Sequence, residues 1–197
     1  MSKIIIPFTA KLVKFDTAVP FTEVVSRLNI AVNKEGSGNF MARLKLVDTQ
    51  DEFTSVINNT IGDSGFLYVL APIVSDQFQT YLSWMIRYFM EVKQHRLLEY
   101  MDGAKKPSAL LYTIGNPLIA QMILKYNIFA AHNIPLRLLI LEKPDEIGAT
   151  VSYYLPSSIL GQPEGGDDSV LHAGVQDLDN RLEKLVERIT KLVHVQL

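Results

Sequence analysis

The run from residue 110 to residue 125 constrains the fold of this chain more than any other stretch. Residues 110–114 form an apolar, β-prone run that predicts a strand. Gly115 favours a turn, Asn116 is a preferred N-cap residue, and Pro117 suits the first turn of a helix. We therefore predict a strand, a tight turn and a helix in direct succession.

Further strands are predicted from short apolar runs with period-two alternation. They span residues 8–15, 42–47, 66–70, 136–142 and 150–155. Residues 143–148 have loop composition, so the last two strands should form a hairpin. Pro156, Ser157 and Ser158 then end the sheet.

Helices are predicted where apolar residues recur every three or four positions. One helix of about 14 residues follows Pro20. Thr49 and Glu52 match a capping box and should open another. Residues 71–89 crowd apolar side chains without a clear period, and we expect a short helix there. Near the end of the chain a heptad seam comprises Val175, Leu178, Leu182, Leu185, Ile189 and Leu192.

The pattern of strands and helices predicts an α+β fold in one domain. With 197 residues, of which 48% are hydrophobic and 20% charged, the chain can bury a sizeable core. We expect a core domain over residues 1–161, with an atypical segment at 69–88, and a loop at 162–168. The amphipathic helix over 169–197 should dock on that core, or alternatively form a coiled coil with a partner chain.

Composition excludes several kinds of function. The formal charge of −2 disfavours nucleic acid as a partner, and the absence of cysteine excludes disulfides and thiolate chemistry. The four histidines lack metal-ligand spacing, so no metal site is expected. No cofactor is expected either. No run reads as a signal peptide or a membrane span, and we predict a cytoplasmic protein without a membrane partner.

Three motifs resemble the domain-of-unknown-function 302 family. They are Y-T-I-G-N-P-L-I-A at residues 112–120, P-L-R-L-L-I-L-E at 135–142 and V-S-Y-Y-L-P-S-S at 151–158. The resemblance extends over about residues 8–160, with a weaker echo at Glu91 and His95. It implies a curved antiparallel sheet with packed helices, of the TATA-binding-protein-like type, and is compatible with homodimers. It implies no reaction, substrate or cofactor.

Residues 69–88 depart from the family pattern, because they separate a strand and an acidic–histidine segment that usually lie close together. They could be an inserted element that covers or extends the core. Alternatively, they could derive from an intron retained in the gene model.

Five residues are candidates for a binding site. Glu91 and His95 have the spacing of a carboxylate–histidine pair on one helix face, although an ordinary surface pair has the same spacing. Asn116 could help bind an anion at a helix N-terminus, or simply cap the helix. Arg137 interrupts an apolar strand and should face solvent, a dimer partner or an anion. Tyr154 lies on a predicted strand and offers a hydroxyl group.

Three functions remain open from the sequence. The favoured one is a small-molecule-binding domain that forms a homodimer. A second is an enzyme in which Glu91 and His95 act as acid and base while Arg137 holds an anionic substrate. A third is an interaction module that acts through the terminal helix.

Overall fold

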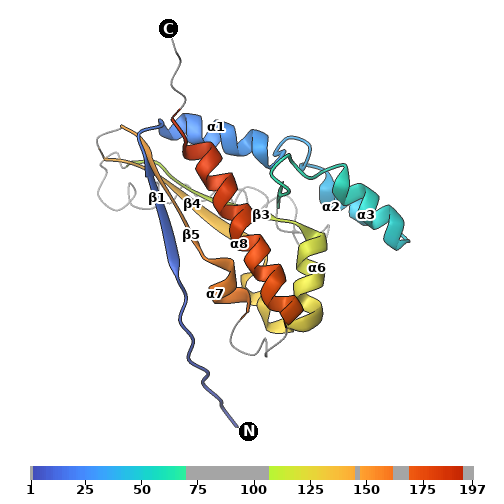
Figure 1. Cartoon of the computed structure of the whole chain (residues 1–197). Helices are drawn as coiled ribbons and strands as arrows, with labels where there is room; N and C mark the ends of the chain where they lie inside the picture. Colours follow the sequence, from blue (N-terminus) through green and yellow to red (C-terminus); the bar gives the residue numbers. More distant parts are fainter. Residues whose placement is uncertain (1, 70–106, 145–146, 162–168, 193–197) are drawn as a thin grey trace.

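The computed structural model describes residues 2–69, 107–144, 147–161 and 169–192 (Figure 1). Its strands form an open, antiparallel, five-stranded sheet with the order β1-β5-β4-β3-β2. They are β1 (Leu12–Thr17), β2 (Leu67–Tyr68), β3 (Ala109–Gly115), β4 (Leu136–Glu142) and β5 (Ala149–Tyr154). The predicted α+β class is therefore confirmed.

The helices gather mainly on one face of this sheet. They are α1 (Phe21–Ala31), α2 (Phe40–Leu44), α3 (Gln50–Asn58), α6 (Pro117–Tyr126), the 3-10 helix η1 (Ile128–Asn133), α7 (Pro156–Leu160) and α8 (Ser169–Thr190). Helices α1, α6 and α8 share one buried apolar cluster with the sheet, and α8 crosses the sheet diagonally (Figure 1). We call the face of the sheet that these helices cover the inner face, and the opposite one the outer face.

The strand, turn and helix predicted at residues 110–125 are confirmed. The Oδ1 atom of Asn116 accepts hydrogen bonds from the backbone N–H groups of Leu118, at 3.0 Å, and Ile119, at 3.5 Å. Its Nδ2 group donates to the backbone carbonyl of Gly65, at 3.0 Å. Gly115 ends β3 without a positive φ angle, so the backbone of this turn does not demand glycine, contrary to our reading of the sequence.

The predicted hairpin between β4 and β5 is also confirmed, and here a glycine is essential. Gly148 has a φ angle of +94°, which side-chain-bearing residues rarely adopt. A Cβ atom at this position would lie 2.0 Å from the backbone oxygen of Thr17. The close approach of this turn to the end of β1 therefore depends on the missing side chain.

The predicted strand at residues 42–47 is wrong, because this region begins with helix α2. Phe40 and Leu44 lie four residues apart, on one side of the helix, and pack in a small cluster with Ile57 of α3. The Arg43 guanidinium donates to the backbone oxygen of Val56, at 3.1 Å, and to Thr60 Oγ1, at 2.7 Å. These tertiary contacts stabilise a helix that the local alternation did not predict.

The first strand begins later than the predicted span of residues 8–15. β1 starts at Leu12, whose partner Tyr154 is the last residue of β5. Pro156 then begins helix α7 and ends the strand there, as we expected of this proline. Residues 2–11 are exposed and lie outside the sheet.

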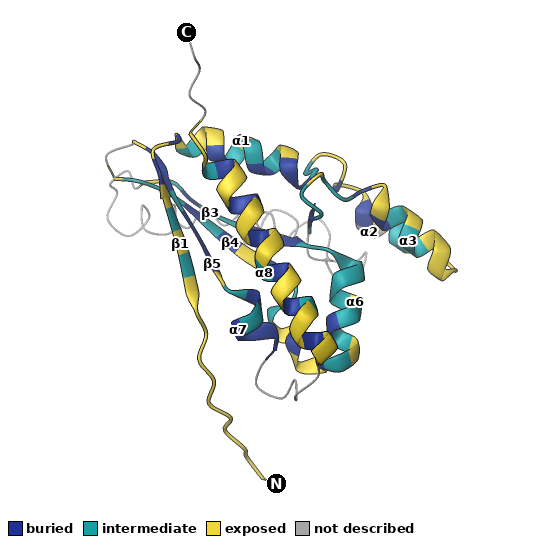
Figure 2. Ribbon diagram, in the orientation of Figure 1, coloured by how far each residue is buried: buried dark blue, intermediate teal, exposed yellow. Residues whose placement is uncertain are grey.

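Helix α8 buries the heptad seam from Val175 to Ile189 in the core of its own chain, but the helix ends at Thr190 and the last predicted seam residue, Leu192, is 51% exposed. The residues that contribute are Leu171, Val175, Leu178, Leu182, Leu185 and Ile189. Figure 2 shows buried and exposed residues alternating along this helix, as expected when one face is buried and the other is exposed. Two polar contacts add to this packing: Asp179 accepts a hydrogen bond from the Ser157 backbone, at 2.8 Å, and the Thr17 hydroxyl donates to the Thr190 carbonyl, at 2.6 Å.

Three predictions concern residues that lie outside the described ones. They are the short helix at residues 71–89, the loop at 162–168 and the atypical segment at 69–88, of which only Val69 is described.

Candidate functional site

The outer face of the sheet carries the candidate site. Along β4, Leu136, Leu138 and Ile140 are buried, whereas Arg137 is exposed and Leu139 and Leu141 are half-buried. Since side chains alternate between the two faces of a strand, the second set points to the outer face. In the part of the chain that the structure describes, helices α1, α6 and α8 pack on the other side.

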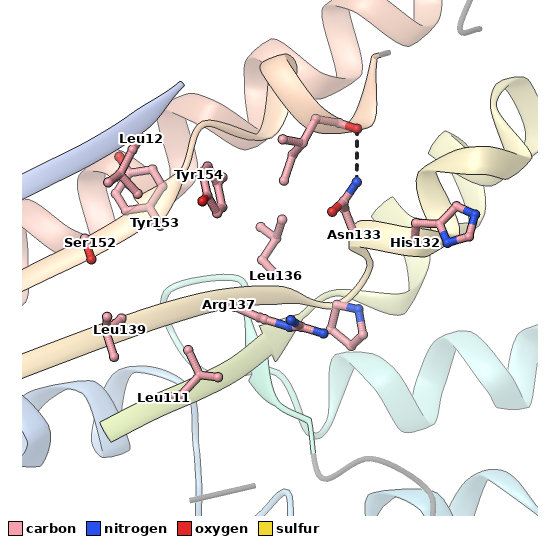
Figure 3. Close-up of a pocket in the computed structure, with 12 residues that line it drawn as sticks. Leu12, Leu111, His132, Asn133, Leu136, Arg137, Leu139, Ser152, Tyr153 and Tyr154 are labelled. Carbon is pink, nitrogen blue, oxygen red and sulfur yellow. Dashed lines mark hydrogen bonds between the residues drawn. The ribbon is translucent and has the colours of Figure 1, made fainter. Parts of the chain in front are cut away.

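A pocket of about 410 Å³ lies on this outer face, where β4 begins and β5 ends (Figure 3). Its lining is mainly apolar, with a few polar side chains. The lining residues are Leu12, Leu111, His132, Asn133, Pro135, Leu136, Arg137, Leu139, Ser152, Tyr153, Tyr154 and Ile159. They come from β1, β3, β4, β5, η1 and α7. The strand registers therefore build this pocket from segments that are distant in sequence.

The pairing of the central strands explains how the pocket floor forms. Leu139 lies opposite Leu111 of β3 and opposite Ser152 of β5. Arg137 precedes Leu139 by two residues and Tyr154 follows Ser152 by two, so both lie on the same face at the same end of the sheet. The result is an apolar floor with a cation and two hydroxyl groups close to it.

The Arg137 guanidinium is not neutralised by any acidic side chain of the described residues. It forms no ion pair or hydrogen bond with them, and none of the described residues that line the pocket is an aspartate or a glutamate. His132 also lines the pocket, at an exposed position. The charge of Arg137 therefore favours a negatively charged ligand over a positively charged one.

Two of the polar lining residues, Asn133 and Tyr153, are poor candidates for ligand chemistry. Asn133 donates a hydrogen bond to the backbone oxygen of Ile159, at 3.4 Å (Figure 3). Burial raises the pKa of Tyr153 to about 12, with a further contribution from three acidic side chains on α8, of which Glu183 has the largest effect. The phenol of Tyr153 therefore stays protonated at neutral pH and does not serve as a base there.

The structure brings two of the five candidate residues together. Arg137 and Tyr154 both line the pocket. Asn116 instead caps α6, next to a separate hollow of only about 20 Å³. Glu91 and His95 lie outside the described residues, so their pairing stays a prediction.

Sequence reasoning missed His132 and Ser152 as lining residues. Ser152 could have been found, because it lies two residues before Tyr154 on the same strand face. No sequence signal pointed to His132, which reaches the pocket from η1.

A second polar cluster joins α1 to the sheet on its inner side. The Lys34 ammonium lies 5.0 Å from the ring centre of Tyr68 and 5.1 Å from that of Tyr112. The Tyr112 hydroxyl donates to Asn29 Oδ1, at 2.7 Å. These contacts connect the end of α1 to β2 and β3, and they are separate from the outer-face pocket.

Two further findings concern metals and membranes. Within residues 2–69, 107–144, 147–161 and 169–192, no three histidine, aspartate or glutamate side chains are grouped so that they could hold a metal ion. Among the helices of the described residues, none has the length and apolar character needed to cross a bilayer. The cytoplasmic location expected from the sequence stays a prediction.

The architecture defines an open antiparallel α+β sheet with its large helices on one face and a pocket on the other. A solved structure with this fold is that of an uncharacterized conserved DUF302 protein from Bacillus stearothermophilus. The likeness covers 90% of this chain and 97% of that one, with a TM-score of 0.53 and 14% sequence identity. It supports the resemblance to the domain-of-unknown-function 302 family at the level of the fold. No family model matches this chain, and no curated protein is similar to it in sequence.

Proposed function

We propose that this chain is a small-molecule-binding domain whose ligand occupies the outer-face pocket. The observation that carries the proposal is the pocket itself, at about 410 Å³. Ligand sites typically have volumes of roughly 300–1,000 Å³ and combine an apolar lining with a few polar groups. Arg137, Ser152 and Tyr154 supply such groups around Leu139.

The position of the pocket supports the same function. Its floor is formed by three neighbouring strands of the sheet: β3 pairs with β4 from Leu141 to Leu136, and β5 pairs with β4 as far as Ser152, opposite Leu139. A floor of this kind keeps the side chains in place before a ligand arrives, which lowers the entropic cost of binding.

A thermal-shift screen with a metabolite library tests this proposal. Leu139→Trp should fill the pocket from its floor, whereas Leu46→Trp places the same side chain at a position that is 83% exposed. We expect compounds that raise the Tm of the natural chain and of Leu46→Trp but not that of Leu139→Trp. The proposal fails if no compound raises the Tm, or if Leu139→Trp responds as the natural chain does.

We also propose that the chain forms a homodimer through the edge of the sheet at β1. The supporting observation is a group of exposed apolar side chains just before this edge strand: Ile4, Ile5, Ile6 and Phe8. An exposed edge with apolar side chains readily pairs with another strand.

Light scattering after size exclusion tests the dimer. The natural chain should elute with twice its monomer mass of 22.2 kDa. Ile5→Lys should shift it toward the monomer, whereas Ile30→Lys, at an equally exposed position on α1 (74% against 75%), should not. A natural chain that remains monomeric at about 100 µM, well above typical weak-dimer affinities, contradicts the proposal.

The other two functions receive less support. An interaction module would need a free apolar seam on α8, and the seam residues up to Ile189 are buried in the chain's own core. The acid–base pair of Glu91 and His95 stays a hypothesis, because both residues lie outside the described ones.

A further inference from the structure

We infer that the ligand of the outer-face pocket is an amphiphilic anion, with its charged group on Arg137 and its apolar body over Leu139. This inference rests on the proposed binding function and adds the chemical class of the ligand. The placement of Arg137 among the described arginines carries it.

Arg137 differs from every other arginine that the structure describes. Three of them form ion pairs with carboxylates, at 2.6 to 2.9 Å, and Arg43 donates to two oxygen atoms of its own chain. The three pairs are Arg27 with Glu23, Arg181 with Asp177 and Arg188 with Asp63. Within the described residues, Arg137 alone has neither kind of contact.

The surroundings of Arg137 are also unlike those of an ordinary surface arginine. It follows Leu136 in an apolar strand, and its neighbour across the ladder is Thr113 of β3 rather than an acid. A guanidinium has five donors in a planar fork that fits carboxylate and phosphate oxygens. An anion that enters the pocket therefore meets a cation whose donors are not occupied by any group of the described residues.

The apolar part of the ligand is specified by the same strand register. Leu139 lies about 7 Å further along β4, since a strand rises about 3.3 Å per residue. Leu111 of β3 lies directly beside Leu139 and extends the apolar surface, whereas Leu12 of β1 lies two strands from β4, opposite Tyr154. A ligand with its charge on Arg137 would therefore lay its hydrocarbon body over Leu139 and Leu111.

The neutral hydroxyl groups near the pocket complete the match. Ser152 is buried, with 8% of its surface exposed, while Tyr154 is 54% exposed at the rim. Both can donate a hydrogen bond to an anionic oxygen, and neither brings a negative charge that would repel one.

Three eight-carbon probes of different charge test the inference: octanoate, octanamide and octylamine. Their dissociation constants would be measured by NMR titration on the natural chain, on Arg137→Gln and on Arg181→Gln. Arg181 is an exposed arginine on α8, remote from the pocket lining, so its variant controls for the loss of one positive charge. Both positions are exposed, and we expect both variants to fold.

We expect octanoate to bind the natural chain roughly tenfold more tightly than octanamide, which is the usual gain from a hydrogen bond to a charged group. Arg137→Gln should remove that preference by weakening octanoate binding more than octanamide binding, and Arg181→Gln should leave the preference as it is in the natural chain. The inference is overturned if octanamide or octylamine binds the natural chain as tightly as octanoate, although binding in the pocket would then stand. It is also overturned if Arg137→Gln keeps the full preference. If none of the three probes binds at millimolar concentration, the proposed binding function for this pocket fails as well.

Discussion

Replacing Asn116 should separate the two roles that its side chain plays in the turn before α6. Its Oδ1 atom caps the helix and its Nδ2 group donates to the Gly65 carbonyl, in a region that is only partly exposed. Loss of a helix cap typically costs about 1 kcal/mol, and loss of a neutral hydrogen bond costs about as much. We therefore expect Asn116→Ala to lower the free energy of unfolding by about 2 kcal/mol.

A second substitution at the same position makes the prediction sharper. Serine keeps a capping oxygen but cannot reproduce the amide donor, so Asn116→Ser should cost about 1 kcal/mol. Urea unfolding measures both changes: with an m-value of roughly 2 kcal/mol/M, the midpoint should fall by roughly 1 M for alanine and by half of that for serine.

Two results would refute this reasoning. If Asn116→Ala unfolds within 0.5 kcal/mol of the natural chain, a threshold near the usual size of a surface effect, the cap does not stabilise the helix. If alanine and serine are equally destabilising, the contact with Gly65 accounts for the whole effect. Because Asn116 lies outside the lining of the outer-face pocket, Asn116→Ser should also leave octanoate binding unchanged.

Three further predictions concern stability. Leu182→Ala should lower the free energy of unfolding by about 2–5 kcal/mol because Leu182 is fully buried, whereas Leu192→Ala, at a heptad position that is 51% exposed, should change it by less than about 0.5 kcal/mol. Chemical denaturation compares the two variants, and equal effects would contradict the burial of the seam. Gly148→Ala should lower the free energy of unfolding by roughly 3 kcal/mol because of the positive φ angle and the nearby Thr17 backbone, whereas Gly38→Ala, where a Cβ would lie 3.4 Å from its nearest neighbour, should lower it far less. Equal urea midpoints for the two variants would refute this prediction. The pKa of Tyr153 is raised to about 12 from an ordinary 10, so the stabilising contribution of its protonated phenol is complete below pH 10 and is lost as the pH rises toward 12. The Tm of Tyr153→Phe should therefore fall less than that of the natural chain across this range, and parallel pH profiles of the two proteins would exclude this linkage.

Local signals in the sequence were sufficient where a segment's neighbours in the chain decide its structure. The capping box at Thr49 is present with both of its hydrogen bonds, and Asn116 caps α6 as its residue type and position suggested. The hairpin of β4 and β5 follows from two β-prone runs separated by a short loop.

Tertiary contacts decided the segments that local patterns could not. Residues 42–47 alternate in a way that fits a strand, but the packing of Phe40 and Leu44 on Ile57 makes residues 40–44 helical. Local propensity is a weak guide when such packing overrides it.

The candidate site was predictable only in part for a similar reason. Alternation places Arg137 and Leu139 on one face of β4, yet the sequence does not reveal which face the helices cover. The pocket also requires Leu12 beside Tyr154, and this contact depends on the pairing of strands that are far apart in the chain.

The pairing of β1 with β5 has a consequence for the order in which the molecule assembles. β3, β4 and β5 follow one another and pair with their neighbours in sequence, so this part of the sheet can form early. β1, in contrast, leaves the ribosome first and must wait for β5, which lies more than a hundred residues later. Until then its apolar side chains have no sheet to join, and a chain interrupted before β5 would expose them to solvent, chaperones and proteases.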